Sequence, residues 1–360
     1  MTQRPRWGVN NAVSRRSVLI GLGAVGAFLA VDLGAVAYAN RWIGSDGTRK
    51  VFLDGFRTVN GPQLGFRKNH AKGVVVTGYF ESNGNAQDLS RAAVFRPGQV
   101  PVVGRFSLSG GDAHAPDTPG AARGLGLAFG FPGRAQWRTA MLNLPVFPDN
   151  SPRGFYDRLL ASKIVPGTGQ PDPAATKAFL AAHPETAAAM AIIKKHPPTT
   201  GFGDSTFRSL NTFYFVDHAD VRTPVRWSLV PQQNTAPSPK PGDTNGLFDA
   251  LIRQLQGGPL RWHLLITIAE PGDPLTDATV GWPADRRSID IGLLTLTGVA
   301  TEAPGNARDI NFDPLTLPDG IEPSDDPLLS ARSDIYAASY RQRTGEPKSP
   351  SAVQVTEVGA

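Results

Sequence analysis

The chain has 360 residues, 40% of them hydrophobic and 19% charged, which is enough apolar material for one large domain or two ordinary ones. Its formal net charge is only +5 and its arginines are scattered singly, so no basic block indicates a nucleic-acid surface and nucleic acid is not an expected partner. Cysteine is absent, which excludes disulfides, a thiolate nucleophile and any cysteine-based metal site.

Residues 1–44 are expected to be a targeting or anchoring segment rather than part of the fold. Arg15-Arg16 stands directly before an apolar run over residues 18–39. This order resembles a twin-arginine export signal, and Ala37-Tyr38-Ala39 would serve as a cleavage site. The same run is also long enough to span the inner membrane and tether the protein there without being cleaved. A third interpretation is a buried N-terminal core helix. The first two readings make the membrane or its export machinery a partner and place the remainder in the periplasm or another extracytoplasmic space.

Short β-rich runs separated by Gly, Pro, Asn and Asp follow between Val51 and about Leu229. Strands this close in sequence favour antiparallel pairing in a barrel or sandwich. Two later runs also predict strands. The runs are GVVVTGYFES, AAVFRPGQVPVVGRFSLS, RGLGLAFGFPG, TAMLNLPVF and NTFYFVD, followed by LRWHLLITIAE and IGLLTLTGVA.

Helices are expected in three places around these strands, so the predicted class is α+β. The Ala-rich residues 171–195 predict one or two helices broken at Pro184, and NGLFDALIRQLQGG predicts another. Residues 231–245 predict an exposed loop. A Pro- and Asp-rich irregular stretch, NFDPLTLPDGIEPSDDPLL, leads into a final helix.

Four residues of this final helix, Arg332, Tyr336, Ser339 and Arg343, recur at spacings of four, three and four, which places them on one helical face. Arginine hydrogen bonds to a tyrosine one turn away would favour the phenolate and lower the phenol pKa from about 10. A phenolate can ligate iron. Taken alone, however, such a pair on an amphipathic helix is more often ordinary packing.

The segment INFDPLTLPDGIEPSDDPLLSARSDIYAASYRQR resembles the proximal haem segment of the catalase superfamily, where an FDP, a Pro-x-Gly-Ile-Glu-Pro-Ser run and an Arg-x-x-x-Tyr helix follow in this order. FRKNHAKGVVVTGYFE is similar to the distal segment, and PVVGRFSLSGGDAHAPDTPGAARGLGLAF to the block after it. The resemblance implies a catalase-type antiparallel β-barrel with surrounding helices in residues 45–347. It also implies a tail over 348–360 and no C-terminal helical domain of the kind full-length catalases carry.

The same resemblance implies roles for individual residues around a haem, expected to be haem b. His70 matches the distal acid and base, and Tyr336 matches the proximal iron ligand. The other matches are Ser107 as the hydroxyl that fixes the His70 tautomer, Arg332 as the partner of the phenolate, Arg67 and Arg105 as propionate-binding arginines, and Phe155 and Phe312 as rings on the two haem faces.

Two positions match the family pattern less well. The family carries a distal amide, and alignment on Pro145 puts Leu142 at its first position and Asn143 at the next, so Asn143 is the candidate for that role. Arg123 matches a family block, but a barrel salt bridge explains it equally well.

A short, exported chain of this kind resembles the catalase-related peroxidases. We therefore expect haem-dependent reduction of hydrogen peroxide or organic hydroperoxides by a small organic reductant, with weak or no catalase activity. Two alternatives stay open: rearrangement of hydroperoxides, as in allene oxide synthases, and haem binding without catalysis. A homo-oligomer is also left open.

Overall fold

The computed structural model describes residues 46–130, 136–235 and 243–358. The expected leader, residues 1–44, lies outside these ranges. Within them, no helix combines the length and the apolar character that crossing a membrane requires.

Antiparallel strands close into an eight-stranded barrel within the described residues. The order is β10, β11, β1, β2, β3, β4, β7 and β9, and β9 pairs again with β10 to complete the ring. This confirms the predicted α+β class with an antiparallel barrel. The barrel strands are β1 (Gly73–Ser82), β2 (Gly98–Leu108), β3 (Arg123–Phe129), β4 (Trp137–Leu142), β7 (Phe207–Arg208), β9 (Arg222–Pro231), β10 (Leu260–Ile268) and β11 (Ser288–Ala300).

Four short strands of the described residues lie outside the ring. β8 (Phe213–Val216) pairs with β9, and β12 (Ile321–Pro323) pairs with β8, so both extend the sheet beyond the barrel. β5 (Ile164–Val165) and β6 (Gln170–Pro171) form a separate hairpin.

The first four residues of β1 are buried on both faces of the strand, which explains the continuous β-branched run there. Val74 and Val76 point into the main barrel core, while Val75 packs in a second cluster on the outside of the barrel. That second cluster includes Phe312 and borders Tyr336. The two sides of β1 therefore connect the barrel core directly to the surroundings of the predicted site.

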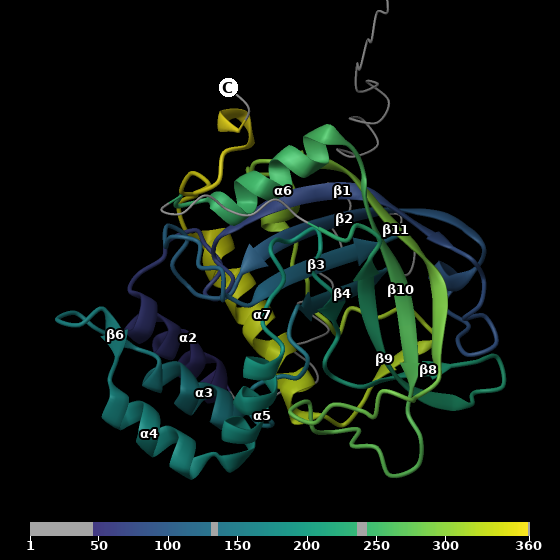
Figure 1. The fold of residues 1–360 in the computed structure, drawn as a ribbon, viewed down its shortest axis with the longest axis horizontal. Coiled ribbons are helices and arrows are strands. Elements are labelled where there is room, and N and C mark those ends of the chain that lie inside the picture. Colours follow the sequence, from purple (N-terminus) through teal and green to yellow (C-terminus); the bar gives the residue numbers. More distant parts are fainter. Residues whose placement is uncertain (1–45, 131–135, 236–242, 359–360) are drawn as a thin grey trace, which may run out of the picture.

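The helices form a layer on one side of the barrel (Figure 1). α2 (Asp46–Asn60), α3 (Pro152–Ala161), α4 (Pro173–Ala182) and α5 (Pro184–Lys195) lie together, and α7 (Pro327–Gly345) passes between them and the strands. α6 (Gly246–Gly257) covers one end of the barrel. Single turns of 3₁₀-helix, η1 (Ala93–Phe95), η2 (Ala307–Asp309) and η3 (Val355–Glu357), complete the described elements.

Two helices were not predicted, because the region from Val51 to Leu229 was interpreted mainly as strands. In α2, Phe52 and Phe56 are four residues apart and both buried, which is the spacing of one helical face. α3 begins at the cap Ser151, whose side chain accepts a hydrogen bond from the Gly154 amide. The predicted break at Pro184 is confirmed, since α4 ends and α5 begins there.

Candidate active site

One cavity lies between the barrel strands, α2, α3 and α7, and it brings together residues from distant parts of the chain. Asn143 is the one predicted site residue that does not line it. The predicted residues that do line it are Arg67, His70, Arg105, Ser107, Phe155, Phe312, Arg332 and Tyr336.

His70 stands in the loop just before β1 with a left-handed backbone, at φ 54°. A non-glycine residue in this region is strained by roughly 1–2 kcal/mol, so neighbouring groups must hold it there. The His70 carbonyl accepts a hydrogen bond of 2.7 Å from Arg105 Nη1, and its amide donates to Asn69 Oδ1. These bonds fix the position from which the imidazole reaches the cavity.

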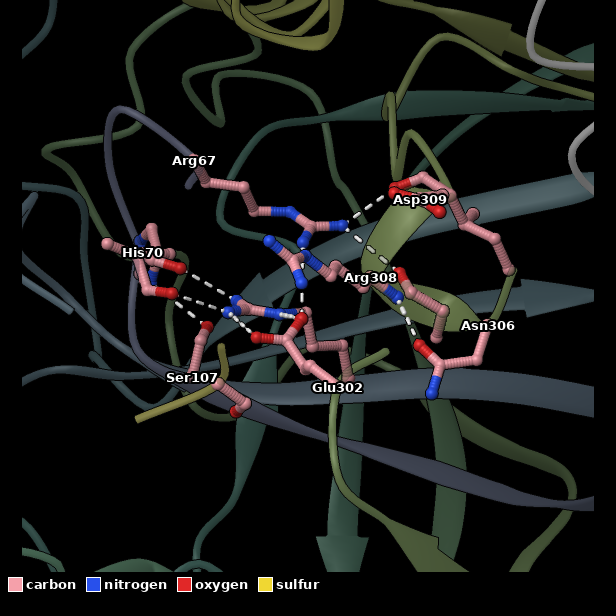
Figure 2. A network of polar contacts seen from close by, with 12 residues as sticks. Arg67, His70, Ser107, Glu302, Asn306, Arg308 and Asp309 are labelled. Atoms are coloured by element: carbon pink, nitrogen blue, oxygen red, sulfur yellow. Dashed lines mark hydrogen bonds and ion pairs between the residues drawn. The ribbon is translucent and has the colours of Figure 1, made fainter. Parts of the chain in front are cut away.

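The His70 imidazole is oriented by Ser107 on β2, whose Oγ lies 3.1 Å from Nδ1 (Figure 2). Burial and the nearby cations Arg105, Arg332 and Arg67 lower the pKa of His70 to about 3. The imidazole is therefore neutral at physiological pH and has a lone pair with which to accept a proton.

Three arginines surround a single buried carboxylate at one end of the cavity. Arg105 Nε and Nη2 donate to Glu302 at 2.7 and 3.0 Å, and Arg67 Nη1 lies 3.4 Å from the same carboxylate (Figure 2). Burial favours a higher pKa for Glu302, but Arg105, Arg67 and Arg343 outweigh it, and the pKa is lowered. Burial and the neighbouring arginines lower the pKa of Arg67.

This cluster carries more positive than negative charge. Buried cations in excess of their carboxylates are stabilised by additional anions. The cavity end near Arg67, Arg105 and Arg343 is thus suited to a ligand that brings carboxylates of its own.

The predicted face of the last helix is confirmed in its geometry, since Arg332, Tyr336, Ser339 and Arg343 all line the cavity from α7. The expected hydrogen bond between Arg332 and Tyr336 is not formed among the described residues. Arg332 donates instead to Asn211 Oδ1 and, at 2.8 Å, to the Ala140 carbonyl. Its guanidinium is held by the barrel, which ties α7 to β4.

The side chain of Asn143 forms its hydrogen bond with the barrel and does not line the cavity. Its Oδ1 accepts a hydrogen bond of 2.8 Å from the Arg123 amide, and its own amide donates to the Arg123 carbonyl. Leu142 lines the cavity in its place. Arg123 is also absent from the cavity lining; its side chain is buried and donates to Ser205 Oγ at 3.1 Å.

Sequence reasoning missed several residues that shape the cavity. Glu302 is a lone acid in the segment after β11, and no spacing or motif marks it as the counterion of Arg105. Phe52 and Phe56 come from the unpredicted helix α2 and pack near Phe155, with ring centroids 6.0 and 6.2 Å from it. Their spacing of four was the available signal for a buried helical face.

The cavity walls suit a flat ligand. Gly124 and Gly126 face the cavity from alternate positions of β3, where they leave the strand surface without side chains. A Cβ on Gly124 would lie 2.8 Å from Ser107 Oγ, and one on Gly126 would lie 2.8 Å from the Phe312 ring. The glycine positions of β3 leave room for a flat ring, and the tyrosine of α7 offers an iron ligand. The arginine cluster suits two carboxylates, so the cavity fits a haem.

Comparison with known proteins identifies the family. The family model for catalase matches residues 50–350. The chain belongs to the catalase family. A catalase-related peroxidase from Synechococcus elongatus is 40% identical over 79% of this chain and 85% of its own length. A catalase-related peroxidase from Mycolicibacterium paratuberculosis is 30% identical over 81% of this chain and 94% of its own length.

A solved bacterial catalase has the same fold, with a TM-score of 0.69 at 22% identity. The match covers 79% of this chain and 58% of that catalase, so the chain spans little more than half of the longer protein. As a member of the catalase family, the protein is a haem-binding oxidoreductase that acts on peroxide.

Proposed function

We propose that the protein is a haem b peroxidase that reduces hydrogen peroxide or organic hydroperoxides with a small organic donor and has weak catalase activity. The single observation that carries this proposal is that one cavity is lined both by a neutral imidazole from the loop before β1 and by a tyrosine from α7. The overall reaction converts one hydroperoxide and two donor molecules to an alcohol or water, a second water and two one-electron-oxidised donors.

Tyr336 would hold the haem through its phenolate oxygen, with Arg67, Arg105 and Arg343 near the haem carboxylates and Phe155 and Phe312 beside the ring. Bound haem supplies the iron centre at which the O–O bond breaks and through which donor electrons pass.

His70 moves the proton. Its neutral imidazole can take a proton from the inner oxygen of the peroxide and return it to the outer oxygen, which then leaves as water or alcohol. With Ser107 Oγ accepting from Nδ1–H, Nε2 keeps the lone pair that this step needs. Ser107 is in this account a positioning residue.

Weak catalase activity is proposed because the cavity has a leucine where a polar side chain could orient a second peroxide. Leu142 lines the cavity, and the amide of Asn143 is bonded to Arg123 instead. Oxygen release from hydrogen peroxide and oxidation of a dye should be measured side by side on the holoenzyme. Dye oxidation should dominate; a kcat/KM for oxygen release on the order of 10⁷ M⁻¹s⁻¹ would overturn this proposal.

We also propose that the protein works outside the cytoplasm, exported or tethered by its leader. The support is Arg15-Arg16 before the apolar residues 18–39. Cell fractionation of the full chain and of an Arg15→Lys, Arg16→Lys double variant tests it. Retention of the parent protein in the cytoplasm would contradict this proposal.

A further inference from the structure

A groove lies between α2 and α7, on the side of α2 that faces the end of α7. It consists of two adjoining hollows of about 330 Å³ each, which share Leu53, Arg57 and Gln342. We call it the α2–α7 groove. Pockets of roughly 300 Å³ and above accommodate small organic molecules.

The groove and the haem cavity share a wall. Phe56 and Lys68 line both spaces. Lys68 is fixed, because its Nζ donates to the Gln63 carbonyl at 2.9 Å and pairs with Glu346 at 3.1 Å. A molecule in the groove is therefore separated from the haem cavity by a layer of ordered side chains.

The groove carries more positive than negative charge. Arg57 is exposed, and its side chain forms no hydrogen bond or ion pair with the described part of the chain, so its charge is available to a ligand. Apolar surface lies beside it, from Leu53 and Leu64. The charged lining comprises Arg49, Lys50, Arg57, Lys68 and Arg341 against Asp54 and Glu346.

We propose that the α2–α7 groove binds the electron donor, and that this donor is a small phenol bearing a carboxylate. The inference rests on the proposed peroxidase function and adds a site and a chemical class to it. The apolar side chains receive the aromatic ring, and Arg57 pairs with the carboxylate. Position beside the shared wall places the donor close to the haem cavity but outside it.

The donor reaction balances. Each phenol gives up one electron and its hydroxyl proton and becomes a phenoxyl radical. Two phenols and one hydrogen peroxide yield two phenoxyl radicals and two waters, so peroxide is the oxidant throughout.

Equilibrium binding to the resting holoenzyme tests the site without turnover. The probes are 4-hydroxybenzoate and phenol, which differ in the carboxylate, and binding is followed by saturation-transfer NMR titration. In Arg57→Gln, we expect 4-hydroxybenzoate to bind about tenfold more weakly and phenol to be nearly unaffected. Arg57→Lys should restore most of the affinity for 4-hydroxybenzoate.

The matched control is Arg96→Gln, which removes another exposed arginine that lines neither the groove nor the haem cavity. It should leave both affinities unchanged. In turnover, Arg57→Gln should raise KM for 4-hydroxybenzoate by the same factor and leave the donor-free reaction with peroxide unchanged. Unchanged binding in Arg57→Gln, or equal weakening in Arg96→Gln, would overturn the inference.

Failure of the underlying function has a different signature. If the holoenzyme does not react with peroxide at all, the peroxidase proposal is wrong, while the binding titration still decides whether the groove takes an aromatic carboxylate.

Discussion

The hydroxyl of Ser107 lies 3.1 Å from Nδ1 of His70, on the side of the imidazole turned away from Nε2. This contact joins β2 to the loop before β1, and with the hydroxyl as the acceptor it leaves Nε2 free to accept a proton. In Ser107→Ala, the rate constant for the reaction with peroxide should fall about tenfold, since one orienting hydrogen bond is lost. Stopped-flow measurement checks it, and unchanged haem content shows that the loss is one of positioning.

The pH dependence of the same step follows from the lowered pKa of His70. In the proposed mechanism the imidazole acts as a base, so the reactive form is the neutral one, which persists at every pH well above about 3. The rate constant for the peroxide reaction should therefore stay flat from pH 8 down to about 5. An acid limb centred near the ordinary histidine value of about 6.5 would show that the cavity does not depress this pKa.

Removing the charge of Glu302 should destabilise the protein, because Arg105 and Arg67 would lose their shared carboxylate. In Glu302→Gln, we expect Tm to fall by roughly 5–10 °C, as for other broken buried ion pairs. Glu322→Gln is the control: its carboxylate pairs with Arg222 at 2.9 Å, but both side chains are about half exposed, and Tm should barely change.

The contribution of Glu302 also has a pH signature. Its folded-state pKa is lowered, so the stabilisation is complete above the unfolded value of about 4.3 and is lost as the pH falls through the folded value. The difference in Tm between the parent and Glu302→Gln should accordingly be constant from pH 8 to about 5 and shrink in stronger acid. A difference that shrinks already between pH 8 and 6 would show that another group is responsible.

Gly124 should tolerate no side chain. A Cβ at this position would lie 2.8 Å from Ser107 Oγ and 3.0 Å from His70 Nδ1, so Gly124→Ala pushes the imidazole and hydroxyl apart. We expect loss of peroxide reactivity of at least the size seen in Ser107→Ala. Gly120→Ala, at a position with open space around its Cβ, provides the control. Normal reactivity in Gly124→Ala would mean that this contact does not position His70.

Local patterns predicted much of the fold and one wall of the site. The β-branched run of β1 and the spacing of Arg332, Tyr336 and Ser339 each depend on residues a few positions apart, and the structure has both as expected. Spacing of this kind is set by backbone geometry alone. The same spacing is therefore found in the folded protein.

Contacts between distant segments could not be predicted in this way. Glu302 meets Arg105 across 197 positions, and Arg332 turns to Asn211 and Ala140 rather than to its neighbour Tyr336. Asn143 has an amide side chain and lies at the position that alignment on Pro145 indicates for the distal amide. The pairing of β3 with β4, however, directs its oxygen to the Arg123 amide. The tertiary fold decides which of several polar partners a side chain contacts. The spacing of residues in the sequence does not carry this information.

The central claim is that a haem lies between His70 and Tyr336, and the absorption spectrum of the purified protein before and after peroxide tests it most directly. The parent and His70→Ala should both carry haem, with a spectral response to peroxide in the parent and almost none in His70→Ala. Tyr336→Phe should lose haem or change its spectrum. A colourless parent that takes up no hemin, or a Tyr336→Phe variant with an unaltered spectrum, would contradict the account.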